Sequence, residues 1–87
     1  LTSAPPDEAA ESGQASRIVE RLLESLSEEK REVFVLAELE ELSGPEIATT
    51  LGLNLNTVYA RLRAARQAFD EAALRFRKAQ QQLRRAR

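Results

Sequence analysis

Residues 43–67, SGPEIATTLGLNLNTVYARLRAARQ, decide the fold of this 87-residue chain. Ser43 with Glu46 three residues later matches the capping box, in which two side chains satisfy backbone amides at the start of a helix. Three apolar residues then follow at helical spacing: Ile47, Ala48 and Leu51. Gly52 suits the end of this short helix, because glycine adopts the left-handed conformation at little cost.

A second, much longer helix is predicted directly after this turn. Asn54 suits its N-cap, since an Asn side chain can accept hydrogen bonds from amides of the first turn. Beyond it, apolar residues recur at alternating steps of four and three, which is the spacing of one helix face. These residues are Val58, Leu62, Ala65, Phe69, Ala72, Phe76, Ala79 and Leu83. A short helix, a glycine turn and a second helix together form the helix-turn-helix pattern.

Two further helices are predicted upstream, so the expected fold is all-α. The first covers about residues 15–25, and Ser27 then suits the N-cap of the second, which is expected to run to about Leu42. We therefore expect a four-helix domain with a C-terminal helix-turn-helix and a long last helix.

The predicted domain organisation has three parts. Residues 1–14 are small, acidic and interrupted by prolines, a composition typical of a flexible linker. The helix-turn-helix domain is expected over residues 15–70 and a helical extension over residues 71–87. The extension continues the apolar stripe beyond what a compact core covers, so it is expected to fray, to pack on the first helix or a second copy, or to bind a protein partner.

Composition excludes several classes of function. The chain has no Cys and no His, which excludes thiol chemistry, zinc-finger sites and catalysis by a histidine base. We expect no enzyme activity, no cofactor and no metal site. No apolar run approaches the roughly 20 residues of a membrane span, and no signal peptide is visible. A cytoplasmic location is therefore expected, and the first residue, Leu1, suggests a piece of a longer chain.

Charge is divided unevenly along the chain. Residues 1–50 contain 12 acidic and 4 basic residues, for a net charge of −8, whereas residues 51–87 contain 2 acidic and 9 basic residues, for +7. Such asymmetry indicates one end that faces nucleic acid. Four acids near the motif are expected to point away from DNA, toward solvent or a basic protein partner: Glu38, Glu40, Glu41 and Glu46.

The long helix carries a polar face that suits double-stranded DNA. At about 100° per residue, Asn56, Tyr59, Ala60, Arg63 and Gln67 lie roughly opposite the apolar stripe. Asn and Arg read adenine and guanine edges through paired hydrogen bonds, and a small residue such as Ala allows close approach or contact with a thymine methyl.

Three further residues flank this face. Thr57 and Arg61 lie on one side of it and Arg66 on the other, where hydroxyl and guanidinium groups can bind phosphates on both walls of a groove. The expected DNA-binding residues are therefore Asn56, Thr57, Tyr59, Ala60, Arg61, Arg63, Arg66 and Gln67.

About residues 17–70 resemble region four of bacterial sigma factors, especially the extracytoplasmic-function class. The matching motifs are Leu26-Ser27, Glu46-Ile47-Ala48, Leu51-Gly52, Thr57-Val58, Arg61-Leu62 and Ala65-Arg66. The resemblance implies a promoter-recognition module that binds the −35 element, docks on the β flap of the RNA polymerase core and is often sequestered by an anti-sigma factor. The chain departs from the family pattern in ways that bear on the promoter sequence read: Asn56, Tyr59, Ala60 and Ala64.

Two other interpretations remain open. A response-regulator output domain of the quorum-regulator type is also four-helical and DNA-binding, usually with dimerisation through its last helix. A helical module whose arginine face binds an acidic protein is the second, and the salt dependence of duplex binding separates it from both DNA-binding interpretations.

Overall fold

The computed structural model describes the backbone of residues 6–86 and the side chains of residues 13–86. In this part of the chain it contains helices and no strands, which confirms the all-α prediction. The elements in order are α1 (Pro6–Glu24), α2 (Glu28–Phe34), the π-helical turn η1 (Val35–Leu39), α3 (Gly44–Leu51) and α4 (Leu55–Arg85).

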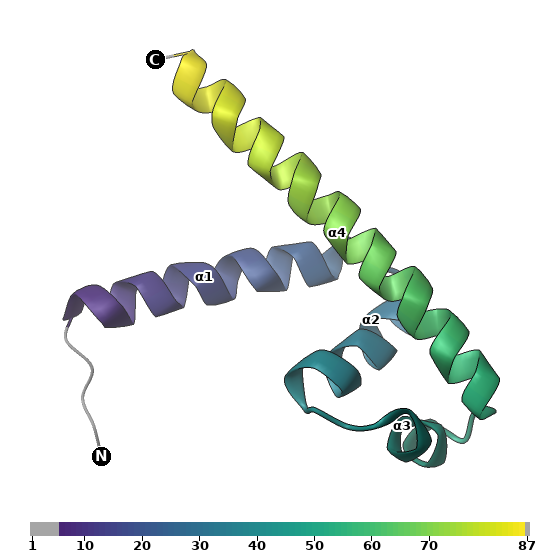
Figure 1. Cartoon of the computed structure of the whole chain (residues 1–87). Coiled ribbons are helices and arrows are strands. Elements are labelled where there is room, and N and C mark those ends of the chain that lie inside the picture. Colours follow the sequence, from purple (N-terminus) through teal and green to yellow (C-terminus); the bar gives the residue numbers. More distant parts are fainter. Residues whose placement is uncertain (1–5, 87) are drawn as a thin grey trace.

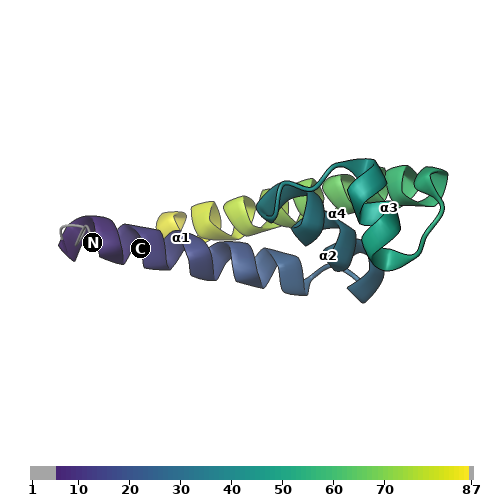
Figure 2. The ribbon, with the colours of Figure 1, turned by 90° about the horizontal axis from the view of Figure 1, so that it is seen from below.

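The molecule is a flat wedge with extents of 49 × 39 × 15 Å. Figure 1 shows α1 and the C-terminal half of α4 diverging as two arms, while α2 and α3 pack beside the N-terminal half of α4. The edge-on view in Figure 2 shows that the two arms lie in nearly one plane, with α2 and α3 at the other end.

Helix α1 begins at Pro6, well before the predicted start at Ala15. The predicted flexible linker over residues 1–14 is therefore wrong for residues 6–14, which are helical, while its residues 1–5 lie outside the described residues. Proline is tolerated in a first helical turn because its fixed φ suits the helix and its missing N–H is not needed there. The Ala- and Glu-rich stretch that follows has high helix propensity, and this outweighs its linker-like polarity.

The sequence predicted that the second helix runs to about Leu42, but the continuous helix of α2 and η1 ends at Leu39. Its last turn widens into a π-helix, in which the Glu40 N–H donates to the Val35 carbonyl at 3.0 Å. Glu41 then adopts a left-handed conformation with φ of 58°, and the Leu42 N–H returns to the Leu36 carbonyl at 2.9 Å. The wide turn thus stops the helix early and brings Leu42 back against the core.

The core is built where α2, α3 and α4 meet the end of α1. Its three largest fully buried side chains are Val33, Ile47 and Val58, one from each of α2, α3 and α4. Leu23 and Leu26 close one side. The rings of Phe34 and Phe69 stack with centroids 4.6 Å apart and add the only aromatic pair among the described residues.

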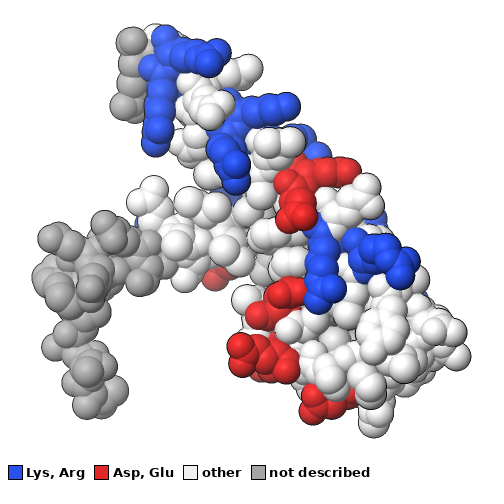
Figure 3. All heavy atoms as spheres, viewed as in Figure 1, with Lys and Arg blue, Asp and Glu red and all other residues white. Residues whose placement is uncertain are grey.

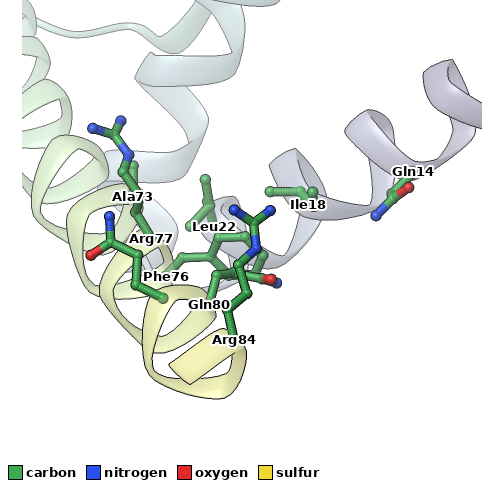
Figure 4. A pocket seen from close by; sticks show the side chains of 9 residues that line it. Gln14, Ile18, Leu22, Ala73, Phe76, Arg77, Gln80 and Arg84 are labelled. Carbon is green, nitrogen blue, oxygen red and sulfur yellow. The ribbon is translucent and has the colours of Figure 1, made fainter. Parts of the chain in front are cut away.

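The apolar stripe of α4 is buried only over part of its length. Val58, Leu62, Ala65 and Ala72 are buried, whereas Leu83 is 65% exposed. Beyond Ala72 the helix leaves the core, continues to Arg85 and faces α1 across an open groove of about 590 Å³. Figure 4 shows Phe76 projecting from α4 toward Leu22 of α1, and Arg77 and Arg84 of α4 also line this groove. The extension is therefore helical, and it contacts the chain's own first helix near its base.

Candidate nucleic-acid interface

Helix α3 is capped at both ends as its sequence predicts. The Ser43 N–H donates to Glu46 Oε1 at 2.8 Å, and the Glu46 N–H donates to Ser43 Oγ at 3.2 Å, which completes the capping box. The hydrogen bonds from the Ser43 backbone and then its side chain lower the pKa of the Glu46 carboxyl below its ordinary value of 4.5. At the other end Gly52 adopts φ of 66°, the left-handed conformation that permits the tight turn.

Helix α4 starts at Leu55, three residues after Gly52, and is positioned by buried side chains of α3 and α4. Asn54 is the N-cap, and its Oδ1 accepts from the Asn56 N–H at 2.8 Å. Ile47 of α3 and Val58 of α4 are both 0% exposed and belong to the same core cluster. Because these two side chains are fully buried, the first turns of α4 are held at a fixed orientation on α3.

The predicted recognition face forms one exposed surface of α4. Asn56, Ala60, Arg63 and Gln67 are all exposed, and their spacing of four, three and four residues places them on one side of the helix. Val58 and Leu62, which face the other way, are buried. The first three turns of α4 therefore present amide, methyl and guanidinium groups outward from a rigid base.

The two residues predicted to flank one side of this face are partly sheltered. Thr57 and Arg61 are half-buried. Arg61 Nη2 lies 3.9 Å from Glu29 Oε2, at the outer limit of an ion pair. A long ion pair whose Glu29 side chain is largely exposed contributes little to stability, so Arg61 can exchange this partner for a phosphate at small cost.

Arg66, on the other flank, forms the shorter ion pair. Its Nε donates to Glu38 Oε1 at 2.7 Å, and the two residues lie 28 positions apart. Glu38 was expected to point away from DNA, and the structure shows that it contacts Arg66 of α4. The guanidinium has further N–H donors beyond Nε, so the pair orients Arg66 without occupying all of its hydrogen-bonding groups.

Tyr59 lies at the edge of the recognition face rather than at its centre. Its side chain is exposed, with 46% of the residue accessible, and its ring rests against Gly44 at the start of α3. Gly44 is not among the residues that the sequence predicted for this surface. One sequence feature pointed to it: glycine has a low helix propensity, so its presence in a predicted first helical turn indicates a packing or functional role.

Charge is distributed as the two halves of the sequence suggest. Figure 3 shows basic side chains along the C-terminal half of α4 and acidic side chains over the region that precedes α3. In the described residues 6–86 no helix is long and apolar enough to span a membrane. The described surface thus combines one basic, DNA-compatible helix with an acidic flank.

Comparison with known proteins identifies the family. The family model for sigma-70, region 4 matches residues 16–69, which is more than half of the chain and includes α2, α3 and the N-terminal half of α4. Searches of curated proteins and of solved structures gave no match. Region 4 domains are the helix-turn-helix, DNA-binding parts of sigma factors that act in transcription initiation, and they are not enzymes. This chain belongs to the sigma-70 region 4 family.

Proposed function

We propose that this domain binds the −35 promoter element through the N-terminal half of α4, as part of a sigma factor of the extracytoplasmic-function class that acts in the cytoplasm. One observation carries the proposal: a doubly capped helix-turn-helix exposes Asn56, Ala60, Arg63 and Gln67 on the face opposite the buried side chains of Val58, Leu62 and Ala65. In helix-turn-helix proteins the second helix lies in the major groove with its first turns at the base edges.

The exposed side chains divide the work of reading and holding DNA. Asn56 and Arg63 suit adenine and guanine edges, and each good two-point pair discriminates by about 1–3 kcal/mol. Ala60 between them has no long side chain, so the helix axis can approach the base pairs closely. Thr57, Arg61 and Arg66 then bind phosphates, which set the register without reading sequence.

The ion pair between Arg66 and Glu38 supports a role for Arg66 in docking. Side chains of both residues are about half exposed, so a phosphate can reach the Arg66 guanidinium while the pair stays formed. When a phosphate arrives, Arg66 keeps its orientation on Glu38 through Nε and donates through its terminal nitrogens. Glu38 also disfavours a shift of the duplex toward the acidic flank, because like charges would then meet.

A second surface suits the RNA polymerase core. An apolar groove of about 400 Å³ lies between α2, η1 and α3, and its apolar lining residues are Val35, Leu36 and Leu51. None of its lining residues belongs to the recognition face, so the β flap of the polymerase can bind there while α4 binds DNA. An anti-sigma factor is a further proposed partner, which would compete with polymerase or with DNA.

Duplex selection from a randomised pool, followed by anisotropy titrations, tests the DNA-binding proposal. Arg63→Ala is expected to weaken binding to the selected duplex by about 1–3 kcal/mol and to change binding to a scrambled duplex little. Arg84→Ala, an exposed arginine near the far end of the same helix, is the matched control and should not alter sequence preference. Failure to enrich any sequence, together with binding that does not weaken as salt rises, would favour a protein-interaction module instead.

A further inference from the structure

Gly44 and Tyr59 meet where the two helices of the motif touch. A Cβ atom built on Gly44 would lie 2.6 Å from Tyr59 Cε1 and 2.8 Å from both Cζ and Oη. Real Cβ contacts essentially never occur below 3.0 Å. The ring of Tyr59 therefore occupies the space that any other residue at position 44 would need.

The backbone gives a second reason for glycine at this position. Among the described residues the glycine with positive φ is Gly52, not Gly44. Gly44, however, is the first residue of α3 and precedes Pro45, and a Cβ on the residue before a proline is disfavoured in the helical conformation. Glycine also costs about 0.5–1 kcal/mol relative to alanine within a helix. Glycine at position 44 therefore avoids two close contacts, one with the ring of Pro45 and one with the ring of Tyr59.

The contact determines the direction of the tyrosine. Tyr59 lies on the side of α4 that faces α3, and its outer part remains exposed. With glycine at position 44 the ring lies on the start of α3. A larger residue at position 44 would place its Cβ against the Tyr59 ring. The Cβ is fixed to the backbone of α3, whereas the ring can rotate, so the ring must swing outward.

We infer that Gly44 is a specificity-determining position of the DNA-binding surface, acting through the placement of the Tyr59 ring. The inference rests on the proposed binding of α4 in the major groove, because Tyr59 precedes Ala60 and Arg63 on the same exposed turns. A ring that lies on α3 extends the contact surface toward the phosphates beside the first helix of the motif. A ring that swings outward enters the space of the duplex next to Ala60. Gly44 is thus a positioning residue, and Tyr59 is the group that touches DNA.

The first test follows the ring without DNA. Tyr59 is the single tyrosine and the chain has no tryptophan, so intrinsic tyrosine fluorescence reports on this side chain alone. Gly44→Ala is expected to raise acrylamide quenching of that fluorescence while the helical circular dichroism and the melting temperature stay close to wild type. Gly13→Ala is the matched control, because a Cβ there meets only an ordinary contact at 3.7 Å with Arg17 Nη1. Unchanged quenching in Gly44→Ala would overturn the inference before any DNA is added.

The second test is a double-mutant cycle on the selected duplex. Gly44→Ala is expected to weaken binding about three- to tenfold, somewhat less than the loss of a two-point base contact, and to shift the sequence preference in a repeated selection. In the Tyr59→Ala background the same substitution should have no further effect, since the ring that transmits it is gone. Tyr59→Phe separates the ring from the hydroxyl and should respond to Gly44→Ala as wild type does.

The outcomes separate this inference from the proposed function. If wild type selects no sequence, the DNA-binding proposal fails, and the quenching result still decides the contact between Gly44 and Tyr59. If wild type selects a sequence but Gly44→Ala binds it equally well with the same preference, DNA binding stands and the inference is wrong. A loss in Gly44→Ala that persists unchanged in the Tyr59→Ala background would also overturn it.

Discussion

Replacing Leu62 by alanine tests whether the recognition helix is held by the core as the structure indicates. Leu62 is 5% exposed and belongs to the central cluster together with Val58 and Ala65 on the same helix. Truncating a buried leucine removes its transfer free energy and leaves a cavity, at a cost of about 2–5 kcal/mol. A chain of this length is stable by about 4–13 kcal/mol, so the substitution removes a large share of the total.

The consequence is measurable by thermal unfolding. For a domain of this size each kcal/mol shifts the melting temperature by about 4–8 °C, so Leu62→Ala is expected to melt about 8–40 °C below wild type. Leu74→Ala is the matched control, because Leu74 lies on the same helix and is 48% exposed. Circular dichroism at 222 nm follows both variants. Equal melting temperatures for the two variants would show that the facing of α4 is wrong, and with it the assignment of the opposite face to DNA.

Three further predictions concern the turn, the cap and the tail. Glu41→Gly is expected to stabilise the domain by about 0.5–1 kcal/mol in urea denaturation, because Glu41 has φ of 58°; destabilisation would mean that the Glu41 side chain contributes more than the conformation costs. The pKa of the Glu46 carboxyl is lowered in the folded state from an ordinary 4.5. The contribution of the ionised carboxylate to stability is therefore complete above that value and is lost as the pH falls through the lowered pKa. The difference in unfolding free energy between wild type and Glu46→Gln should shrink from about pH 7 to about pH 3, and a constant difference would exclude this linkage. Phe76→Asp should increase hydrogen exchange in the C-terminal half of α1, because Phe76 lines one groove together with Ile18 and Leu22. Leu83→Asp should not, and identical exchange in the two variants would show that the arms do not support each other.

Most of the fold follows from local patterns in the sequence. The capping box of Ser43 and Glu46, the left-handed Gly52 and the Asn54 cap are all confirmed. Each of these devices acts over four residues or fewer, so the residues that form it are visible together in the sequence. The apolar spacing of α4 likewise placed its buried and exposed faces correctly through Ala72.

The boundaries that were wrong depend on balances that spacing does not reveal. The start of α1 at Pro6 results from helix propensity in a segment with little apolar surface, where polarity alone indicated a linker. The π-turn over Val35–Leu39 arises because Leu42 must return to the core, and a regular helix would have carried it past that position. A single sequence shows helix propensity, polarity and apolar spacing separately, but it does not show which of these decides a helix boundary.

What the sequence alone determined is the composition of the proposed recognition surface: which turns of α4 carry Asn56 and Arg63, and which side of the helix faces inward. Only the tertiary structure decided how its edges are arranged. The ion pair of Arg66 with Glu38 joins residues 28 positions apart, and the Tyr59 ring lies on Gly44 of the preceding helix. The physical reason is that helix periodicity relates residues within a few turns of one another, whereas contacts between helices depend on crossing geometry and on side-chain volumes at the crossing point.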